Sequence, residues 1–478
     1  MARMTSEPLP MHAIFDAQYQ ASRAQMEVPL ALRRDRLKRL RRLIEDHSGA
    51  LCAAVEGDFG VRSGSVTEVA DLFMLRSLLS HLNTHLARWM KPIKVATPVY
   101  LKPATAYIQR QPLGVVGVIS PWNYPIQLAF APAATALAAG NRVMLKPSEL
   151  TPRTSQLIAD LVHDHFDEEE FCVIQGDSAL AARFAALPFD HLFFTGSTAV
   201  GRKVAAEAAA NLTPMTLELG GKSPCIIDRT CDLSDAAVKI AHGKLLNAGQ
   251  TCIAPDYVLL PKGQETKFEK EFAAAVKRLF PSIEGNPDYT SLLNDRYFER
   301  MQAMLADAQA RGASLKVIDP QGSVAGSPAT AKRQMAPVLV FNPVSGMRVM
   351  EEEIFGPILP VLTYGSLDEA IGIINARPRP LALYWFGTST AARDKVLNNT
   401  VSGGVSVNDT LMHIAHENLP FGGVGESGWG AYHGHTGFLR LTHEKGVLVQ
   451  SRMGVGSLFY PPYGVRFEQV TAMLKRVL

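Results

Sequence analysis

The sequence has little cysteine and no long hydrophobic run, and each shortage argues against a class of protein. Its five cysteines among 478 residues are scattered and include no Cys-x-x-Cys pair. This argues against a disulfide framework or a zinc site and indicates a reducing compartment. No apolar signal-peptide core follows the first residues. The longest apolar run, 126–140, contains Pro132 and is shorter than the roughly 18 residues that a membrane span needs. We therefore expect a cytoplasmic protein with no membrane partner.

A strong excess of charge of one sign is also missing. The net charge is +3, and 47% hydrophobic with 19% charged residues is the composition of a well-packed globular enzyme. Nucleic acid is therefore not expected as a partner. The local exception is 33–42, where seven of ten residues are Lys or Arg. Leu37, Leu40 and Ile44 recur there at helical spacing, which favours an amphipathic surface helix over a membrane-surface or polyanion site.

The chain alternates between strand-like and helix-like segments after a helical start. Residues 12 to about 95 carry leucines and isoleucines at helical spacing. From about 99 onward, short β-branched runs such as "GVVGVIS" precede helical stretches, and a second series of this kind begins near "MTLELGGKSPCIID". Strand, loop and helix in repetition are typical of a parallel sheet with crossover helices. The length favours two or three domains.

Two strand ends carry residues suited to a nucleotide. "FFTGSTAVG" places Gly196 and Ser197 between a strand and a helix, where free N–H groups and the helix dipole favour phosphate. "MLKPSE" adds Lys146 and Glu149, which could hold ribose hydroxyls or phosphate oxygens. Taken alone, the first motif is more often an ordinary turn, and the second is more often a solvated loop with a surface ion pair.

Three further segments carry groups that could act on a substrate. Asn123 in "ISPWNYP" is crowded by Trp122 and prolines, so its amide could stabilise an oxyanion or simply satisfy a turn. Glu218 ends the apolar run "LELGG", which suits a general base with a raised pKa, although Lys222 could equally pair with it. "EEEIFGP" offers Glu353 and Phe355, as ligand contacts or as part of an acidic cap.

Cys252, in "NAGQTCIAPDY", is the candidate nucleophile. A thiolate needs a base or a nearby cation, and this run contains no histidine. His413 and His416 are three residues apart, but a lone pair without a third ligand gives little support for a metal site, and none is predicted. From its own run alone, Cys252 remains either a nucleophile or a small buried apolar residue.

Together and in order, these segments resemble the aldehyde dehydrogenase superfamily over nearly the whole chain. The matching motifs are "SPWNYP", "KPSE", "FTGST", "LELGGKSP", "GQTC", "EEIFGP" and "LPFGGVGESGWGAYHG". "GQTCIAPDYV" and the last motif are most similar to the class 3 type group, and within it to bacterial coniferyl aldehyde dehydrogenases. The implied fold is a Rossmann-type NAD-binding domain, an α/β catalytic domain and a small β oligomerisation extension.

The resemblance implies a role for each matching residue. Cys252 would attack the aldehyde, Asn123 would hold the oxyanion, and Glu218 would activate water against the resulting thioester. The remaining matches would bind the cofactor: Trp122, Lys146, Glu149, Gly196, Ser197, Glu353 and Phe355. Glu353 is also a candidate second base. No histidine is needed, because a carboxylate can accept the thiol proton and a cationic nicotinamide favours the thiolate.

The resemblance also implies the cofactor, the substrate and the domain plan. Glu149 should favour NAD, since a carboxylate repels a 2′-phosphate, with NADP also possible. The substrate should be a hydrophobic aldehyde, expected to be aromatic such as coniferaldehyde, with Trp122 and Tyr124 as candidate lining. Residues 1–98 and 113–218 would form the NAD-binding domain, and 219–408 the catalytic domain. Segments 99–112 and 430–450 would form the oligomerisation strands of a homodimer.

Two alternatives stay open. One is a broad-specificity or long-chain aliphatic aldehyde dehydrogenase. The other, from a different class, is a cysteine acyltransferase or esterase that uses Cys252 without a redox cofactor.

Overall fold

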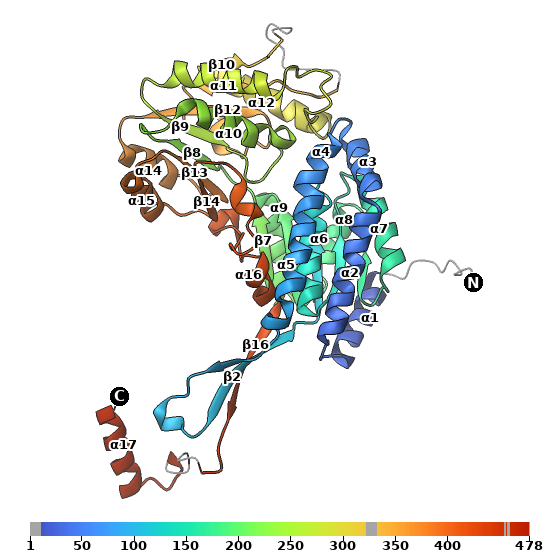
Figure 1. Cartoon of the computed structure of the whole chain (residues 1–478), viewed down its shortest axis with the longest axis vertical. Helices are drawn as coiled ribbons and strands as arrows, with labels where there is room; N and C mark the ends of the chain where they lie inside the picture. The colour runs from blue at the N-terminus through green and yellow to red at the C-terminus, as the bar shows by residue number, and fades with distance from the viewer. Residues whose placement is uncertain (1–10, 322–331, 454–455, 457–458, 478) are drawn as a thin grey trace, which may run out of the picture.

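The chain forms two α/β units and a small antiparallel sheet that projects away from both (Figure 1). This computed structural model describes residues 11–321, 332–453, 456 and 459–477. The predicted α/β class with parallel sheets and crossover helices is confirmed. In the described part of the chain, no helix combines the length and the apolar character that crossing a membrane requires.

The first unit is built on a six-stranded sheet of largely buried strands. Its order is β15 (Gly428–Trp429), β7 (Met215–Leu219), β6 (His191–Gly196), β3 (Val115–Ile119), β4 (Arg142–Lys146) and β5 (Phe171–Val173). Only β15 runs antiparallel to its neighbour. The register places Thr195 beside Glu218 and Ile119 beside Lys146. These four residues therefore lie at one edge, at the carboxyl ends of the strands, where open α/β sheets bind ligands.

Helices pack on both faces of this sheet. Most of residues 12 to about 95 are helical, as the sequence pattern predicts. The helices are α1 (Met11–Ala24), α2 (Leu30–Asp46), α3 (Ser48–Phe59), α4 (Gly64–Thr67), α5 (Met74–Trp89), α6 (Gln127–Ala139), α7 (Pro152–His165), α8 (Ser178–Ala185), α9 (Thr198–Ala209) and α16 (Gly434–Arg440). The alanine-rich α6 is buried along its whole length, because small side chains let helices α2 and α5 pack closely on it. A π-helical turn, Glu68–Phe73, joins α4 to α5.

The second unit has a seven-stranded sheet. Its order is β10 (Ser314–Val317), β11 (Val338–Phe341), β12 (Ile358–Tyr364), β9 (Tyr257–Pro261), β8 (Pro224–Ile227), β13 (Ala382–Phe386) and β14 (Gly404–Val407), with β10 antiparallel. Its helices are α10 (Leu233–Leu245), α11 (Glu265–Leu279), α12 (Asp295–Ala310), α13 (Arg348–Glu351), α14 (Leu367–Asn375) and α15 (Thr390–Asn399). The chain crosses from one unit to the other after Leu219, in the segment between β7 and β8.

The projecting sheet pairs β1 (Ile93–Val95), β2 (Thr105–Pro112) and β16 (Thr442–Val449). Strands β2 and β16 pair over eight residues each, and helix α17 (Val465–Val477) follows beyond the sheet (Figure 1). Between residues 430 and 441 the chain instead forms α16, which packs on α5 and α6. Apolar side chains are exposed on the small sheet, among them Ile93, Val95, Leu448 and Val449.

Candidate active site

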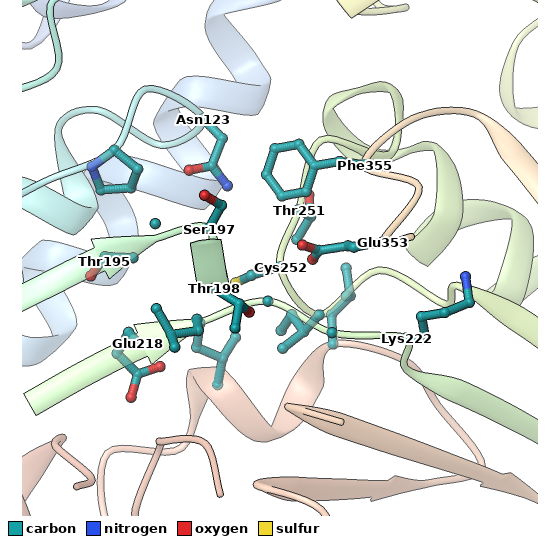
Figure 2. Close-up of a pocket in the computed structure, with 18 of the residues that line it drawn as sticks. Asn123, Thr195, Ser197, Thr198, Glu218, Lys222, Thr251, Cys252, Glu353 and Phe355 are labelled. Atoms are coloured by element: carbon teal, nitrogen blue, oxygen red, sulfur yellow. The ribbon is translucent and has the colours of Figure 1, made fainter. Parts of the chain in front are cut away.

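A cavity of about 1440 Å³ is lined by residues of both units and brings together most of the predicted site residues (Figure 2). Its lining includes Trp122, Asn123, Gly196, Ser197, Glu218, Cys252, Glu353 and Phe355. Lys146 and Glu149 are not part of this lining and are described below. The lining includes loops at the carboxyl edge of the first sheet and the turn that carries Cys252.

The Cys252 turn is shaped by an unusual backbone. Helix α10 ends at Leu245, and then Asn247, Ala248 and Gly249 all have positive φ, at 53°, 54° and 79°. A side chain at Gly249 would place its Cβ 2.4 Å from the carbonyl oxygen of Gly356. Glycine is therefore required there on both conformational and steric grounds. Two consecutive non-glycine residues in the left-handed region represent strain that surrounding contacts must offset.

Amide side chains supply those contacts. Asn247 donates from Nδ2 to the carbonyl oxygens of Asn123 at 3.0 Å and Gln250 at 3.2 Å. Gln250 donates to the carbonyls of Asn247 and Ser291 and accepts from the amide of Leu293. The predicted rigidity of Asn123 is found, because its Nδ2 donates to the Gln250 carbonyl at 3.1 Å. Its partner is thus the Cys252 turn rather than its own loop, and one Nδ2 hydrogen is left for a ligand.

A buried ion pair supports the Asn123 loop from behind. Arg62 and Asp71 are fully buried, with Nη2 and Oδ2 2.7 Å apart. Arg62 also donates from Nη1 to the Asn123 carbonyl at 2.5 Å, and Asp71 accepts from the backbone amides of Ile126 and Gln127. Nearly every charged atom of the pair is therefore hydrogen-bonded, as buried charges require. The pair ties the helical start of the chain to the loop that carries Asn123.

Two carboxylates, Glu218 and Glu353, line the same cavity as the Cys252 thiol. Burial raises the pKa of this thiol above the ordinary range, and the nearby Glu218 and Glu353 raise it further. These surroundings hold the sulfur as a thiol until a base takes the proton or a cation approaches. The two negative charges disfavour the thiolate, so the base or cation that the lack of a histidine calls for stays a prediction.

Glu218, the second-last residue of β7, is 3% exposed. Neither of its carboxylate oxygens has a hydrogen-bond partner among the described residues, and burial raises its pKa well above the usual value. In Figure 2 the Glu218 carboxylate is turned away from the Cys252 sulfur. The alternative of a pair with Lys222 is wrong, because Lys222 forms its ion pair with Asp256. Glu218 therefore has the character of a desolvated base.

The Lys222–Asp256 pair holds the turn that carries Glu353. Lys222 donates to the carbonyls of Val349 at 2.8 Å and Glu352 at 3.0 Å, and Asp256 accepts from the Ile354 amide at 3.0 Å. Arg300 adds a bond of 2.5 Å to the Glu353 carbonyl. The acidic segment 351–353 is thus held by Lys222 and Arg300, which lie on other elements. It does not act as a simple helix cap.

The Glu353 side chain lies against a glycine pair. A Cβ at Gly220 would come within 2.1 Å of its Oε2, so only glycine leaves room for this carboxylate. Burial and Asp256 raise the pKa of Glu353 to about 8, although an amide hydrogen bond from Gly221 lowers it. Glu353 is therefore a second carboxylate near Cys252 that is able to hold a proton at neutral pH.

Aromatic rings form one wall of the cavity. Trp122 packs edge-on against Phe355, with ring centroids 5.4 Å apart, and its indole N–H donates to the Tyr297 hydroxyl at 3.1 Å. Phe355 has a positive φ of 53°, which is uncommon for a residue other than glycine. Sequence patterns identified Trp122 and Phe355 but not Tyr297, which lies on α12.

The first turn of α9 lines the cavity with backbone N–H groups. Ser197 caps this helix by accepting from the Val200 amide at 3.4 Å, and Ser197, Thr198 and Ala199 all face the cavity. The buried Thr195 hydroxyl has no partner among the residues that the structure describes. A helix start with free donors beside a large cavity fits the pyrophosphate of a dinucleotide.

Lys146 and Glu149 lie beyond β4 and form an ion pair, with Nζ and Oε2 2.6 Å apart. Lys146 is 2% exposed, whereas the Glu149 side chain is 42% exposed. The sequence-based alternative of an ion pair between Lys146 and Glu149 is therefore correct for the contact that these two side chains make. Glu149 is still close enough to influence the hydroxyl of Tyr297, which does line the cavity.

Comparison with known proteins agrees with this arrangement. The aldehyde dehydrogenase family model matches residues 5–447, so the chain belongs to that family and is an aldehyde dehydrogenase. Coniferyl aldehyde dehydrogenase of Pseudomonas sp. is 47% identical over 93% of this chain and 92% of its own. Aldehyde dehydrogenase family 3 member A2 of Mus musculus is 38% identical over 93% of this chain and 90% of its own. The predicted superfamily and class 3 resemblance are confirmed.

A solved structure extends the match to the fold. The substrate-bound state of Staphylococcus aureus AldH superposes with a TM-score of 0.91 at 37% identity, covering 98% of this chain and 100% of the other. Members of this family use NAD or NADP, which agrees with the helix start and the large cavity described above. The predicted mixed α/β fold is that of this family.

Proposed function

We propose that the protein oxidises an aromatic aldehyde such as coniferaldehyde to the carboxylic acid through a thioester on Cys252. The observation that carries this proposal is the convergence of Cys252, Asn123 and Glu218 on one cavity. The name of the Pseudomonas relative, at 47% identity, supports the choice of aldehyde.

Carbon–sulfur bond formation is the first step. The Cys252 thiol gives its proton to Glu353 or Glu218 in its ionised form, and the resulting thiolate attacks the aldehyde carbon; the charges of both carboxylates act on this sulfur. The free Nδ2 hydrogen of Asn123 and the Cys252 backbone N–H then hold the oxyanion of the thiohemiacetal. The hydrogen bond from Asn123 Nδ2 to the Gln250 carbonyl supports this role, because it holds the amide in a fixed orientation.

The nicotinamide cofactor, when bound, supplies a hydride acceptor. Gly196 and Ser197 would hold its pyrophosphate, and Trp122, Glu353 and Phe355 would contact its nicotinamide end. Lys146 and Glu149 would hold the adenine ribose, and the Glu149 carboxylate favours NAD over NADP. The lining of the cavity by Ser197, Glu353 and Phe355 supports this assignment.

Thioester hydrolysis completes the reaction. Glu218 takes a proton from water, the hydroxide attacks the thioester carbon, and the acid leaves as Cys252 recovers its sulfur. The unpartnered oxygens of Glu218 support this role, since a carboxylate engaged in an ion pair would be a weaker base. Glu353 is the alternative base, and its raised pKa keeps that assignment open to test.

The mouth of the cavity supports a hydrophobic substrate. Val69 and Phe73, on the π-helical turn, and Met412 are 63%, 60% and 58% exposed and all line the cavity. An exposed apolar rim favours an aldehyde with an apolar or aromatic body. The same rim favours, as a second candidate, a long-chain aliphatic aldehyde.

We also propose the domain plan and the assembly inferred from the sequence: 1–98, apart from β1, and 113–218 for the NAD-binding domain, 219–408 for the catalytic domain, and segments 99–112 and 430–450 for oligomerisation, where β2 and β16 pair with β1 in the small sheet. The exposed apolar residues on β1 and β16 support a homodimer joined through the small sheet. Light scattering that shows a monomer at assay concentration would contradict this assembly.

A substrate panel tests the proposed function. Purified protein is assayed with NAD and, in parallel, coniferaldehyde, benzaldehyde and a long-chain aliphatic aldehyde, and kcat/KM is compared. We expect the aromatic aldehydes to have the highest values. A preference for the aliphatic aldehyde would favour the second candidate. Ester or acyl transfer without any aldehyde-dependent NADH or NADPH would favour a cofactor-independent acyltransferase instead.

A further inference from the structure

One buried hydrogen bond joins the chain neighbours of the two residues that would begin the reaction. Tyr124 directly follows Asn123. Thr251 directly precedes Cys252. The Tyr124 hydroxyl and Thr251 Oγ1 lie 2.6 Å apart, and both residues are 7% exposed and line the cavity. The steps assigned above use neither hydroxyl, so the place of this bond beside both reacting groups needs its own explanation.

This bond crosses from one α/β unit to the other. Tyr124 lies between β3 and α6 of the first unit, whereas Thr251 lies between α10 and β9 of the second. The bond of 3.1 Å from Asn123 Nδ2 to the Gln250 carbonyl crosses the same boundary. Two consecutive residues of the first unit are thus bonded to two consecutive residues of the second, immediately before the nucleophile.

The Tyr124 ring is held from within the first unit. The guanidinium carbon of Arg62 lies 5.0 Å from the centroid of this ring, and Arg62 also donates to the Asn123 carbonyl. Arg62 is fully buried and paired with Asp71, so moving it would leave a buried charge unpaired. One guanidinium therefore fixes both the backbone of Asn123 and the ring whose hydroxyl reaches Thr251.

A second tyrosine holds the other side of Cys252. The hydroxyl of Tyr384, on β13, donates to the carbonyl oxygen of Ile253. Strand β13 belongs to the seven-stranded sheet, so this bond stays within the unit that carries the nucleophile. Tyr384 thus fixes the nucleophile within its own unit, and Tyr124 ties it to the unit that carries Asn123.

We propose that the Tyr124–Thr251 hydrogen bond is a positioning contact for the nucleophile. It holds the Cys252 sulfur at its reacting distance from the Asn123 amide. The sulfur must meet the aldehyde carbon while the amide meets the developing oxyanion, and these two groups come from different units. A misplacement of about 1 Å between reacting groups can cost about 100-fold in rate. This inference rests on the proposed roles of Cys252 and Asn123.

Tyr124→Phe and Thr251→Val test the contact, because each removes one hydroxyl and keeps the shape of the side chain. With the aldehyde that the enzyme oxidises best, we expect each variant to lose about tenfold in kcat. The double variant should lose no more than either single one, since both remove the same bond. KM for the aldehyde and the calorimetric Kd for NAD should change by less than about twofold. Thr251→Ser keeps the hydroxyl and should retain most of the activity.

An Asn123→Ala background separates positioning from a general structural role. With no amide to align, adding Tyr124→Phe should lower kcat by less than about twofold further. A hydroxyl that only stabilises the fold would cause the same loss in both backgrounds. Tyr364→Phe is the matched control: it removes a buried hydroxyl that bonds the Ile227 carbonyl at 2.7 Å, outside the cavity lining, and should leave kcat unchanged.

Failure of the proposed function would be seen separately. A substrate panel without aromatic preference contradicts the proposed substrate, while the variants can still be compared with any aldehyde that the enzyme oxidises. A Cys252 peptide that never becomes acylated in the wild type contradicts the proposed nucleophile. The positioning role would be overturned by full kcat in Tyr124→Phe, by losses that multiply in the double variant, or by equal losses with and without the Asn123 amide.

Discussion

The turn that carries Cys252 and the wall that carries Glu218 lie on the same cavity but differ in how their polar groups are satisfied. Around the Cys252 turn, Asn247 and Gln250 are bonded to neighbouring backbone, and Arg62 is paired with Asp71. Elsewhere in the lining, the carboxylate oxygens of Glu218 and the hydroxyl of Tyr432 have no hydrogen-bond partners among the described residues.

This difference matches the two roles that the proposed reaction requires, a nucleophile and a base. A nucleophile must be held at a fixed position, so its support is fully hydrogen-bonded and rigid. Groups that accept and pass on protons must change partners during the reaction, so they are left unpaired at a cost in stability. Each of the following experiments changes one side of this comparison.

Replacing the nucleophile should have the largest effect. Cys252→Ala removes the atom that forms the thioester, so we expect oxidation to fall by at least about 10⁴-fold. Binding of NAD, measured by calorimetry, should survive because the proposed cofactor contacts are unchanged. Residual turnover near the wild-type rate would show that another residue is the nucleophile.

The next largest effect is expected at the proposed base. Glu218→Gln keeps the shape of the side chain but cannot accept a proton, so steady-state turnover should fall by about 10²-fold or more. Stopped-flow absorbance should still show one equivalent of NADH per site before the reaction stalls. If Glu353→Gln gives this behaviour and Glu218→Gln does not, the base is Glu353.

Loss of the Arg62–Asp71 ion pair that supports the Asn123 loop should lower the free energy of unfolding. Asp71→Asn leaves Arg62 buried without a counter-charge, which should lower the free energy of unfolding by about 3 kcal/mol. Chemical denaturation measures this change. Asp235→Asn, in a pair with Lys239 that is mostly exposed, is the matched control and should change it by less than about 1 kcal/mol. Equal losses in the two variants would contradict a supporting role for the buried pair.

The raised carboxylate pKa values should make stability fall with pH. Folded Glu353 keeps its proton up to a pKa of about 8, whereas unfolded chains lose it near the ordinary 4.5. The folded state therefore binds more protons between these values, and the free energy of unfolding decreases as pH rises through that window. Denaturation in urea across this range should show a smaller decrease for Glu353→Gln than for the wild type. An identical slope in both would contradict the raised pKa.

The smallest effect is expected at the cofactor end. Glu149→Gln removes the carboxylate that should repel a 2′-phosphate, so the ratio of kcat/KM for NAD to that for NADP should fall by about tenfold, or roughly 1.4 kcal/mol. kcat itself should change little, because Glu149 is outside the cavity lining. An unchanged ratio would remove Glu149 from cofactor selection.

Sequence patterns predict the parts of the site that lie at strand ends and in short motifs. Glu218 lies at the carboxyl end of β7 and Ser197 directly follows β6, and because these parallel strands end at one edge, the pattern of strands brings both residues to that edge. Arg62, Asp71 and Tyr432 cannot be found in this way. Arg62 is 185 residues from Asn247, and such long-range partners leave no local periodicity or spacing in the chain.

The side-chain pairings do not follow from spacing either. Lys222 is four residues from Glu218 and is a plausible partner for it by distance along the chain, yet it pairs with Asp256 from the start of another strand. Which carboxylate Lys222 pairs with depends on the path of the chain between β7 of the first sheet and β8 of the second sheet. Spacing along the sequence does not specify that path. Which carboxylates remain unpaired is therefore a property of the assembled site.

The central claim is that Cys252 carries the acyl group while Glu218 drives its removal. The most direct test is the mass of the Cys252 peptide from Glu218→Gln protein quenched after mixing with NAD and coniferaldehyde. We predict that this peptide gains the mass of the acyl group from the aldehyde in nearly every molecule. An unmodified peptide in a variant that turns over normally would contradict the account.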